Sequence, residues 1–454
     1  MNVKLTVAAL AAIILAFAAA FLSFWFLPPE KPRIAAETVD PDEILTVEDG
    51  PEDITVDTEV TVSVRNDMYS FGVTEAMNAV ISDYFKRYYT SIGMLEYQSM
   101  DDLYYFDTRY ERELTASMQK YYITTRSAMT EDLRYNRCAV GLEYTGAEYL
   151  GDGSIRIELM ENHEIDFLYL HSAGITSYSC GIEHTFVLHP IEDEFSIVSH
   201  FEISGVYKML AEAFDKLLDR SRLTLKTMDD ARIRDQFAIM LEKLCSECTD
   251  TLEKMYALRD EYNADPASFA VQKTADHPYD PGSALAYSYT WANKYDMIRN
   301  SDHYGVYDNL GGNCNNFTSQ CLFAGGIPMD CSGTLKAQWK WYSDGIDASQ
   351  TAAGRSMSWT GVDEFYEYCL ANTGFGLVCE PHSNIYSGRP GDIIEYIVGK
   401  EAVHSVIITK VVTDKNGNVI DYLINSNTTD RVEYPMSAYG YTKFRLIRIV
   451  GWND

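Results

Sequence analysis

The chain has 454 residues, more than one compact core usually needs, so we expect two or three domains. Hydrophobic residues at 46% and aromatic residues at 13% exclude a disordered or low-complexity chain. The 37 Lys and Arg against 67 Asp and Glu give a formal charge of −30. A protein with so negative a net charge repels polyanions, so we expect no binding to nucleic acid.

The first element is an apolar run at residues 5–27, which only Thr6 and Ser23 interrupt. As a helix it would be about 34 Å long, enough to cross a hydrocarbon core of ~30 Å. We therefore predict a signal anchor, with residues 1–29 as the transmembrane helix of a single-pass protein of the cell membrane. A signal peptide cleaved near Ala18–Ala20 is the alternative, and both interpretations place the rest of the chain outside the cytoplasm.

Residues 30–65 have the composition of a linker. Ten acidic residues and no Lys or Arg lie between Glu37 and Glu59, together with Pro41, Gly50 and Pro51. Like charges repel, and little apolar surface is available to bury. We therefore predict an extended, solvated stalk.

Residues 66–205 change from a helical to a strand period. Apolar residues at intervals of three and four predict a helix at 73–85, and short alternating runs follow at 139–144, 154–159, 165–170, 177–187 and 195–203. A helix followed by an antiparallel meander is typical of an α+β domain. The order of elements is similar to that of the cone-shaped nuclear-transport-factor-2-like folds. Residues 206–265 return to the helical period and predict a helical connector.

The histidines and cysteines of these regions do not have metal-ligand spacing. His163, His171 and His184 are isolated in the sequence, so we expect no metal there. Cys138 and Cys180 lie on or beside predicted strands, and both a disulfide and two buried thiols remain open.

The most informative segment runs from Asn309 to Gly326 and reads NLGGNCNNFTSQCLFAGG. Its paired glycines predict a turn, Asn313 an N-cap, and residues 314–324 a helix. Cys314 is then the first helical residue, where unpaired backbone N–H groups and the helix dipole stabilise a thiolate. The same amides can stabilise the oxyanion that forms when a thiolate attacks an acyl carbon.

The base that such a thiolate needs is predicted at His404, near the start of a β-type run at 402–411. Asn416-Gly417 then predicts a hairpin whose returning strand is 419–427. With a two-residue loop, Asn425 and Asn427 share a face with His404, and Asn427 lies diagonally from it, placed to orient the imidazole. A three-residue loop would move both asparagines to the other face.

From Tyr279 to the C-terminus, the sequence resembles the putative amidase domain family of secreted and membrane-attached bacterial proteins, relatives of the NlpC/P60 and papain-like cysteine hydrolases. The matching segments are the cysteine segment at 311–326, Trp339–Tyr342, Ser358-Trp359, Gly391–Ile394 with His404 after it, and Asn425–Arg431. The resemblance implies an amidase domain at residues 278–454 with a papain-like α+β fold.

The resemblance also implies roles: Cys314 as nucleophile, His404 as general base and Asn427 as the residue that orients the imidazole. Two positions depart from the family pattern. Asn313 stands where the family has an acidic residue, which removes a negative charge and should lower the thiol pKa. Asn427 stands where the family has a histidine, yet it can still form hydrogen bonds.

Asn313, Trp341 and Trp359 are the candidate substrate-binding residues. The tryptophans can line an apolar-walled cleft, and packing in the core is the alternative. No metal or nucleotide motif is present, so we expect no cofactor.

The expected fold class is therefore α+β: a transmembrane helix, an α+β middle domain, a helical connector and a papain-like C-terminal domain. The leading functional interpretation is a membrane-anchored extracellular cysteine hydrolase that cleaves an amide bond through a thioester. Peptides of bacterial peptidoglycan are the substrate expected by analogy. Acyl transfer to an amine is an alternative within this chemistry, and a non-catalytic cell-surface binding protein with a pseudoenzyme domain is an alternative from another class.

Overall fold

The computed structural model describes residues 39–48, 58–106, 108–221, 228–332, 334, 337–341, 355–382, 384–440 and 443–454. Within this part of the chain, thirteen strands form one mixed sheet. Their bounds are β1 (Ile44–Thr46), β2 (Glu59–Val64), β3 (Tyr135–Tyr149), β4 (Ile155–Phe167), β5 (Ser177–Ile191), β6 (Glu194–Glu202), β7 (His277–Pro278), β8 (Gly376–His382), β9 (Ile393–Val398), β10 (Glu401–Thr413), β11 (Val419–Ser426), β12 (Asp430–Pro435) and β13 (Phe444–Asn453). The main path is β2-β3-β4-β5-β12-β11-β10-β9-β13-β7, and β1, β6 and β8 pair with β10, β5 and β13.

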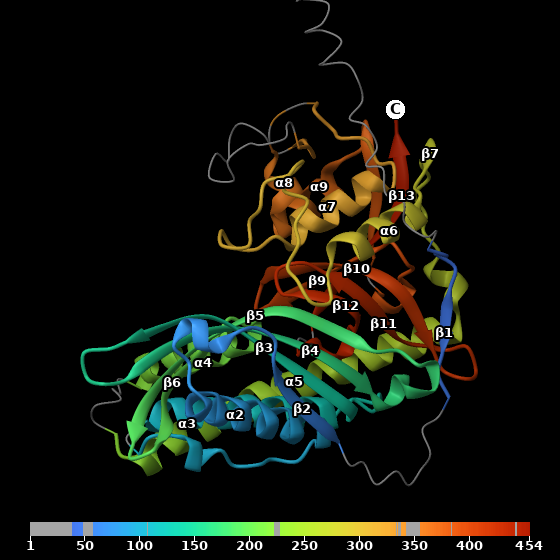
Figure 1. Cartoon of the computed structure of the whole chain (residues 1–454). Helices are drawn as coiled ribbons and strands as arrows, with labels where there is room; N and C mark the ends of the chain where they lie inside the picture. Colours follow the sequence, from blue (N-terminus) through green and yellow to red (C-terminus); the bar gives the residue numbers. More distant parts are fainter. Residues whose placement is uncertain are drawn as a thin grey trace, which may run out of the picture. The chain divides into compact units, whose positions relative to one another are not determined.

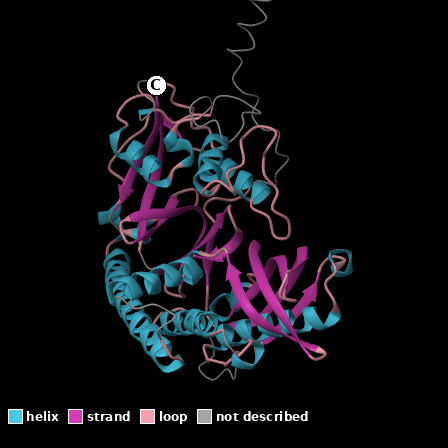
Figure 2. Ribbon diagram, turned by 90° about the vertical axis from the view of Figure 1, so that its left-hand side faces the viewer, coloured by secondary structure: helices cyan, strands magenta, loops and turns pink. Residues whose placement is uncertain are grey.

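The helices form two groups. Those of the N-terminal half are α2 (Glu75–Met94), α3 (Arg109–Ser127), α4 (Gly205–Ser221) and α5 (Asp230–Ala264), and those of the C-terminal half are α6 (Pro281–Trp291), α7 (Cys314–Ala324), α8 (Met357–Thr360) and α9 (Val362–Ala371). In Figure 1, α2, α3 and α5 lie below β3 and β4, whereas α6 to α9 lie above them. Figure 2 shows the same separation from the side.

The N-terminal half has the predicted order of a helix followed by a meander. β3, β4, β5 and β6 pair antiparallel in chain order, and α2 packs on β2, β3 and β6. Cys138 and Cys180 are buried free thiols on β3 and β5. The region predicted as a connector folds as α4 and α5, which pack against α3.

The sequence predicted a separate middle domain and C-terminal domain, but their strands pair with each other in the structure. β5 pairs antiparallel with β12, and Arg431 lies opposite Ser179. One cluster of buried hydrophobic side chains also includes residues of both halves, among them Tyr84, Phe167 and Val406. The strands assigned by sequence to a middle domain and a papain-like domain therefore belong to one mixed sheet.

The predicted stalk at residues 30–65 is wrong where the structure describes it. Ile44–Thr46 pairs in parallel with β10, and Glu59–Val64 pairs in parallel with β3. Both segments contain β-branched residues, which favour strands, although the region around them is acidic. They add to the sheet at its edges.

The fold class and the membrane location also need correction. The predicted signal anchor at residues 5–27 lies outside the described residues. Among the described residues, no helix has the length and apolar character needed to cross a membrane. The described residues form an α+β fold built on a mixed sheet.

Candidate active site

Cys314 is the first residue of α7, as the glycine pair and the helical period predicted. Gly311 and Gly312 have φ angles of 101° and 116°, a conformation that favours glycine and that turns the chain into the helix. The cysteine is 6% exposed. Its sulfur therefore lies beside the first backbone amides of a helix, which have no acceptor within the helix itself.

Asn313 occupies the N-cap position, but its side chain makes no capping hydrogen bond. Its Oδ1 accepts from Nδ2 of Asn316 at 2.8 Å and from the backbone N–H of Tyr307 at 3.3 Å. Its Nδ2 donates to Oδ1 of Asn427 at 3.0 Å. At 2% exposure, the predicted substrate-binding Asn313 holds the turn before Cys314 through buried contacts.

The packing of α7 on β10 brings Cys314 to the strand that carries His404. Oγ1 of Thr318, one turn along α7, lies 3.2 Å from Oγ of Ser405. Burial raises the pKa of the Cys314 thiol to about 11, although the backbone amides of Ser405 and Asn315 act to lower it. The nucleophile candidate is thus a protonated thiol directly beside the residue that follows His404.

His404 points its ring toward a tyrosine. Nε2 lies 2.7 Å from the hydroxyl of Tyr439, which belongs to a short 3₁₀ turn at Ser437–Tyr439. Burial lowers the pKa of the imidazole to about 3, and the nearby positive charge of Arg431 contributes. The histidine is therefore neutral at neutral pH and has one nitrogen engaged with Tyr439.

Asn427 does not contact His404 through any hydrogen bond that the described residues show. Its Nδ2 donates to the carbonyl of Trp291 at 2.9 Å and to Asp430 at 3.3 Å, and its Oδ1 accepts from Asn313. The structure thus places Asn427 on the nucleophile side of the site. Its predicted contact with the imidazole is made by Tyr439 instead.

The hairpin register explains this difference. The backbone N–H of Asp414 donates to the carbonyl of Asn418, so the loop has three residues instead of two. Further along, Asn425 pairs with Ile407, where the two-residue loop predicted Ile408. Asn425 therefore lies on the face of Ser405 and Ile407, and the prediction that it shares a face with His404 is wrong.

Both predicted substrate-binding tryptophans are buried. Trp359 is 0% exposed, donates from Nε1 to Oδ1 of Asn316 at 2.9 Å and packs on Trp339 at a centroid distance of 4.7 Å. Trp341 is 5% exposed and lies against Tyr304 and Tyr307. Trp359 thus packs against α7 through Asn316, and the burial of both tryptophans differs from the predicted open cleft.

Tyr439 and Glu395 are two site residues that the sequence did not indicate. Glu395 is fully buried on β9 opposite Ser405 and is paired with Arg445. Burial raises its pKa to about 8, and its negative charge acts to raise the pKa of Cys314. Neither residue lies in a recognisable motif, because each reaches the site through strand pairing or a turn.

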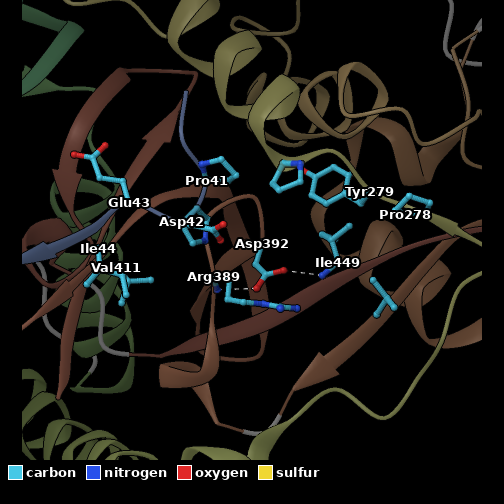
Figure 3. A pocket seen from close by; sticks show the side chains of 13 residues that line it. Pro41, Asp42, Glu43, Ile44, Pro278, Tyr279, Arg389, Asp392, Val411 and Ile449 are labelled. Carbon is cyan, nitrogen blue, oxygen red and sulfur yellow. Dashed lines mark hydrogen bonds between the residues drawn. The ribbon is translucent and has the colours of Figure 1, made fainter. Parts of the chain in front are cut away.

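Asp392 lies in the Gly391–Ile394 segment that resembles the amidase family, and its contacts hold neighbouring parts of the backbone together. It accepts hydrogen bonds from the backbone N–H groups of Arg389 at 2.8 Å and Ile449 at 2.7 Å (Figure 3). It also forms an ion pair with Arg448 at 2.7 Å. A cavity of about 430 Å³ beside it is lined by β1, the start of α6 and the end of β13. Cys314, His404 and Tyr439 do not line this cavity.

Comparison with known proteins gives a family match in the C-terminal part of the chain. Residues 278–450 match the family model described as "Putative amidase domain". This match covers less than half of the chain. The chain is also similar to "Uncharacterized protein YhbB" of Bacillus subtilis (strain 168), with 32% identity over 157 residues, 34% of this chain and 44% of the relative. The match thus spans less than half of that relative's length, and no solved structure matches significantly.

Proposed function

We propose that this protein is a cysteine-dependent amidase in which Cys314 is the nucleophile, His404 the general base and Tyr439 the residue that orients the base. The observation that carries the proposal is the placement of Cys314 at the start of α7, against the backbone of Ser405, the residue that follows His404 on β10. The amidase-family match supports the general reaction class, hydrolysis of an amide bond.

The reaction begins when the thiol transfers its proton to the imidazole while the sulfur attacks the substrate. With Nε2 of His404 engaged by Tyr439, Nδ1 is the nitrogen that takes the proton of Cys314. A thiol pKa near 11 and an imidazole pKa near 3 favour the neutral pair in the free protein. The proton therefore moves as the sulfur attacks, and not before the substrate binds.

The second step forms and collapses a tetrahedral intermediate. The sulfur bonds to the acyl carbon, and the first amides of α7 stabilise the resulting oxyanion. The imidazolium then donates its proton to the leaving nitrogen, the C–N bond breaks, and an acyl thioester on Cys314 remains. Water, deprotonated by the neutral His404, hydrolyses the thioester and restores the thiol.

Asn427 and Asn313 have a positioning role in this proposal. Their side chains bond to each other at 3.0 Å, and the backbone N–H of Asn313 donates to Oγ1 of Thr428. These contacts tie the turn before Cys314 to the end of β11. Asn427 therefore acts on the placement of the nucleophile.

Peptides of bacterial peptidoglycan are the proposed substrate class, by analogy with extracellular cysteine hydrolases. Full-length protein is incubated with muropeptides and a panel of simple acyl amides, and the released amine is quantified. Acid quenching followed by mass spectrometry locates any acyl adduct. We expect the adduct on Cys314 and loss of amine release in Cys314→Ala. Cys321→Ala, a buried cysteine of the same helix, serves as the matched control and should retain activity.

The alternatives give different results in the same experiment. Faster thioester loss on addition of an amine, with a new amide as product, would indicate acyl transfer. Neither adduct nor amine release across the panel would favour a pseudoenzyme that binds its ligand without turnover. Activity that survives in Cys314→Ala would rule out the cysteine mechanism.

A further inference from the structure

A second cluster of chemically capable side chains lies in the N-terminal half, inside the meander strands. It contains His163 and Glu161 of β4, His184 of β5, and His200 and Glu202 of β6. Each is at most 9% exposed. These residues are scattered in the sequence, but strand pairing places Glu202 directly opposite His184 and puts His200 opposite Phe186, one pleat period along the same face.

The hydrogen bonds of His184 determine which nitrogen carries its proton. Nε2 lies 2.9 Å from Oε2 of Glu161, and a carboxylate can only accept. Glu161 is 2% exposed, and its Oε1 also lies 2.6 Å from Nδ1 of His163 and accepts a hydrogen bond from the hydroxyl of Tyr89. When Nε2–H of His184 donates to this carboxylate and Nδ1 carries no proton, Nδ1 presents a lone pair.

That lone pair points at a second histidine. Nδ1 of His184 lies 2.9 Å from Nε2 of His200, whose Nδ1 is 3.0 Å from the hydroxyl of Tyr84. If the Nδ1–H of His200 donates to Tyr84, both facing nitrogens carry lone pairs, and a cation between them removes their repulsion. A carboxylate or hydroxyl on the far nitrogen is the usual outer-shell partner of a metal-binding histidine.

Glu202 supplies a third ligand atom. One ligand atom each from His184, His200 and Glu202 lie within 4.8 Å of one another. In a tetrahedral zinc site with bonds of about 2.0–2.1 Å, ligand atoms are ~3.3 Å apart, so a pair of ligand atoms at the 4.8 Å limit must approach by about 1.5 Å when the ion binds. Glu202 is 9% exposed, and a bound cation would offset the cost of burying its charge.

We propose that His184, His200 and Glu202 bind a Zn²⁺ ion, with Glu161 and Tyr84 holding the two imidazoles in the required tautomers. Two histidines and one glutamate are a known zinc ligand set, which leaves one tetrahedral position for water or another donor. The expectation that this region has no metal came from linear spacing, whereas these ligands come together through the pairing of β5 with β6. The site is separate from Cys314 and independent of the proposed amidase reaction.

The same contacts have one competing explanation. Tyr84 can donate to His200, His200 to His184, and His184 to Glu161, which gives a continuous hydrogen-bonded chain without a metal. In that case, the cluster would be a buried polar network of the core. In the hydrogen-bonded network a proton lies between the two histidines, so no lone pair is left there to bind a metal. Measuring metal binding therefore distinguishes the two explanations.

The test uses the full-length protein purified without a histidine tag. Metal content is measured by elemental analysis, and the chelator-treated protein is titrated with Zn²⁺ and with Co²⁺. We expect about one ion per chain and Co²⁺ absorption bands typical of a four-coordinate site. Glu202→Gln and His200→Gln should bind Zn²⁺ at least about tenfold more weakly. His189→Gln, which changes a β5 histidine outside the cluster, should bind like the unchanged protein.

Two results would overturn the proposal. The first is a chain without metal that takes up neither ion and shows no four-coordinate Co²⁺ spectrum; this measurement needs no variant and holds even if a substitution prevents folding. The second is equal Zn²⁺ affinity in Glu202→Gln, His200→Gln and the unchanged protein, with all three folded by circular dichroism. Either result would assign the cluster to the hydrogen-bonded chain.

Discussion

Tyr439 occupies the place beside His404 where the sequence pattern predicted an asparagine. Its hydroxyl lies 2.7 Å from Nε2 of His404 and 3.3 Å from Oγ of Ser426. A hydroxyl can accept from Nε2–H while it donates to Ser426, and this arrangement leaves the lone pair on Nδ1. Only that tautomer can receive a thiol proton at Nδ1, so in the proposed mechanism the role of Tyr439 is to favour this form of His404.

Tyr439→Phe should therefore lower kcat by about ten- to a thousandfold while KM changes little, because the ring remains and only the orienting hydroxyl is lost. Steady-state kinetics over a range of pH provide the measurement. Tyr434→Phe, on a ring 6.0 Å away, is the matched control. An effect on KM alone, or equal effects of the two variants, would show that the hydroxyl does not orient the base.

The protonation state of Cys314 gives a second prediction at the residue scale. With a thiol pKa of about 11 and an imidazole pKa of about 3, both groups are neutral between those values. Alkylation requires the thiolate, so its rate at Cys314 should keep rising from pH 7 to about pH 10. Iodoacetamide labelling, read by peptide mass spectrometry, provides the rate. A plateau below pH 8 would instead indicate a thiolate–imidazolium pair in the free protein.

At the scale of elements, the hairpin of β10 and β11 determines which side chains meet. Gly417 closes the three-residue loop with a φ of 82°, and its N–H donates to the carbonyl of Asp414 at 3.0 Å. Two register shifts then follow along the ladder, one between Val412 and Thr413 and one between Ile408 and Lys410. Each bulge changes which residues lie opposite one another. The length of the loop and the two register shifts together therefore determine which side chains share a face with His404.

Gly417→Ala should lower the free energy of unfolding by about 1 kcal/mol, because a Cβ in the left-handed region is strained even where space is free. No atom lies within 4 Å of the Cβ that alanine would add. Urea denaturation measures the change. Gly151→Ala, at another open hairpin turn without a left-handed φ, is the control and should lose less. Equal losses would mean that the left-handed conformation of Gly417 is not the cause.

Local patterns in the sequence predicted part of the site. The glycine pair and the helical period placed Cys314 at a helix start, because both signals act within a few residues. The strand of His404 followed from β-branched residues in the same way. The orienting residue did not follow, because its identity depends on loop length and bulges that change the register by single residues. Tyr439 reaches the imidazole from a turn that carries no motif.

At the scale of the whole molecule, pairing between distant segments joins what the sequence pattern separated. Oγ of Ser177 donates to the carbonyl of Glu433 at 2.7 Å, across 256 residues of sequence. The periodic pattern of a segment does not indicate with which distant segment it pairs. The strands of one sheet were therefore predicted as parts of two domains. The join is next to the candidate active site, since Arg431 of β12 pairs with Ser179 of β5 and lies close to Tyr439.

Arg431 connects the two halves electrostatically. Its guanidinium lies 4.8 Å from the centroid of the Tyr439 ring and 4.5 Å from that of Tyr434, and it donates to Oγ of Ser179. Burial is the main cause of the low pKa of His404, and the charge of Arg431 lowers it further. Arg431 of β12, whose guanidinium donates to Ser179 of β5, thus helps to keep His404 neutral.

Arg431→Gln should therefore raise the pKa of His404 above about 3, while burial keeps it below the ordinary value of about 6.5. Because the folded-state pKa is depressed, the stability that His404 contributes is present above pH ~6.5 and is lost as the pH falls toward 3. The loss should be smaller in the variant. NMR titration of the imidazole, assigned with His404→Gln, measures the shift. Arg137→Gln, which removes a guanidinium paired with Asp166 on the meander, should leave the pKa of His404 unchanged. An unchanged pKa in Arg431→Gln as well would mean that burial alone keeps His404 neutral and that the join between the halves has no electrostatic effect on the base.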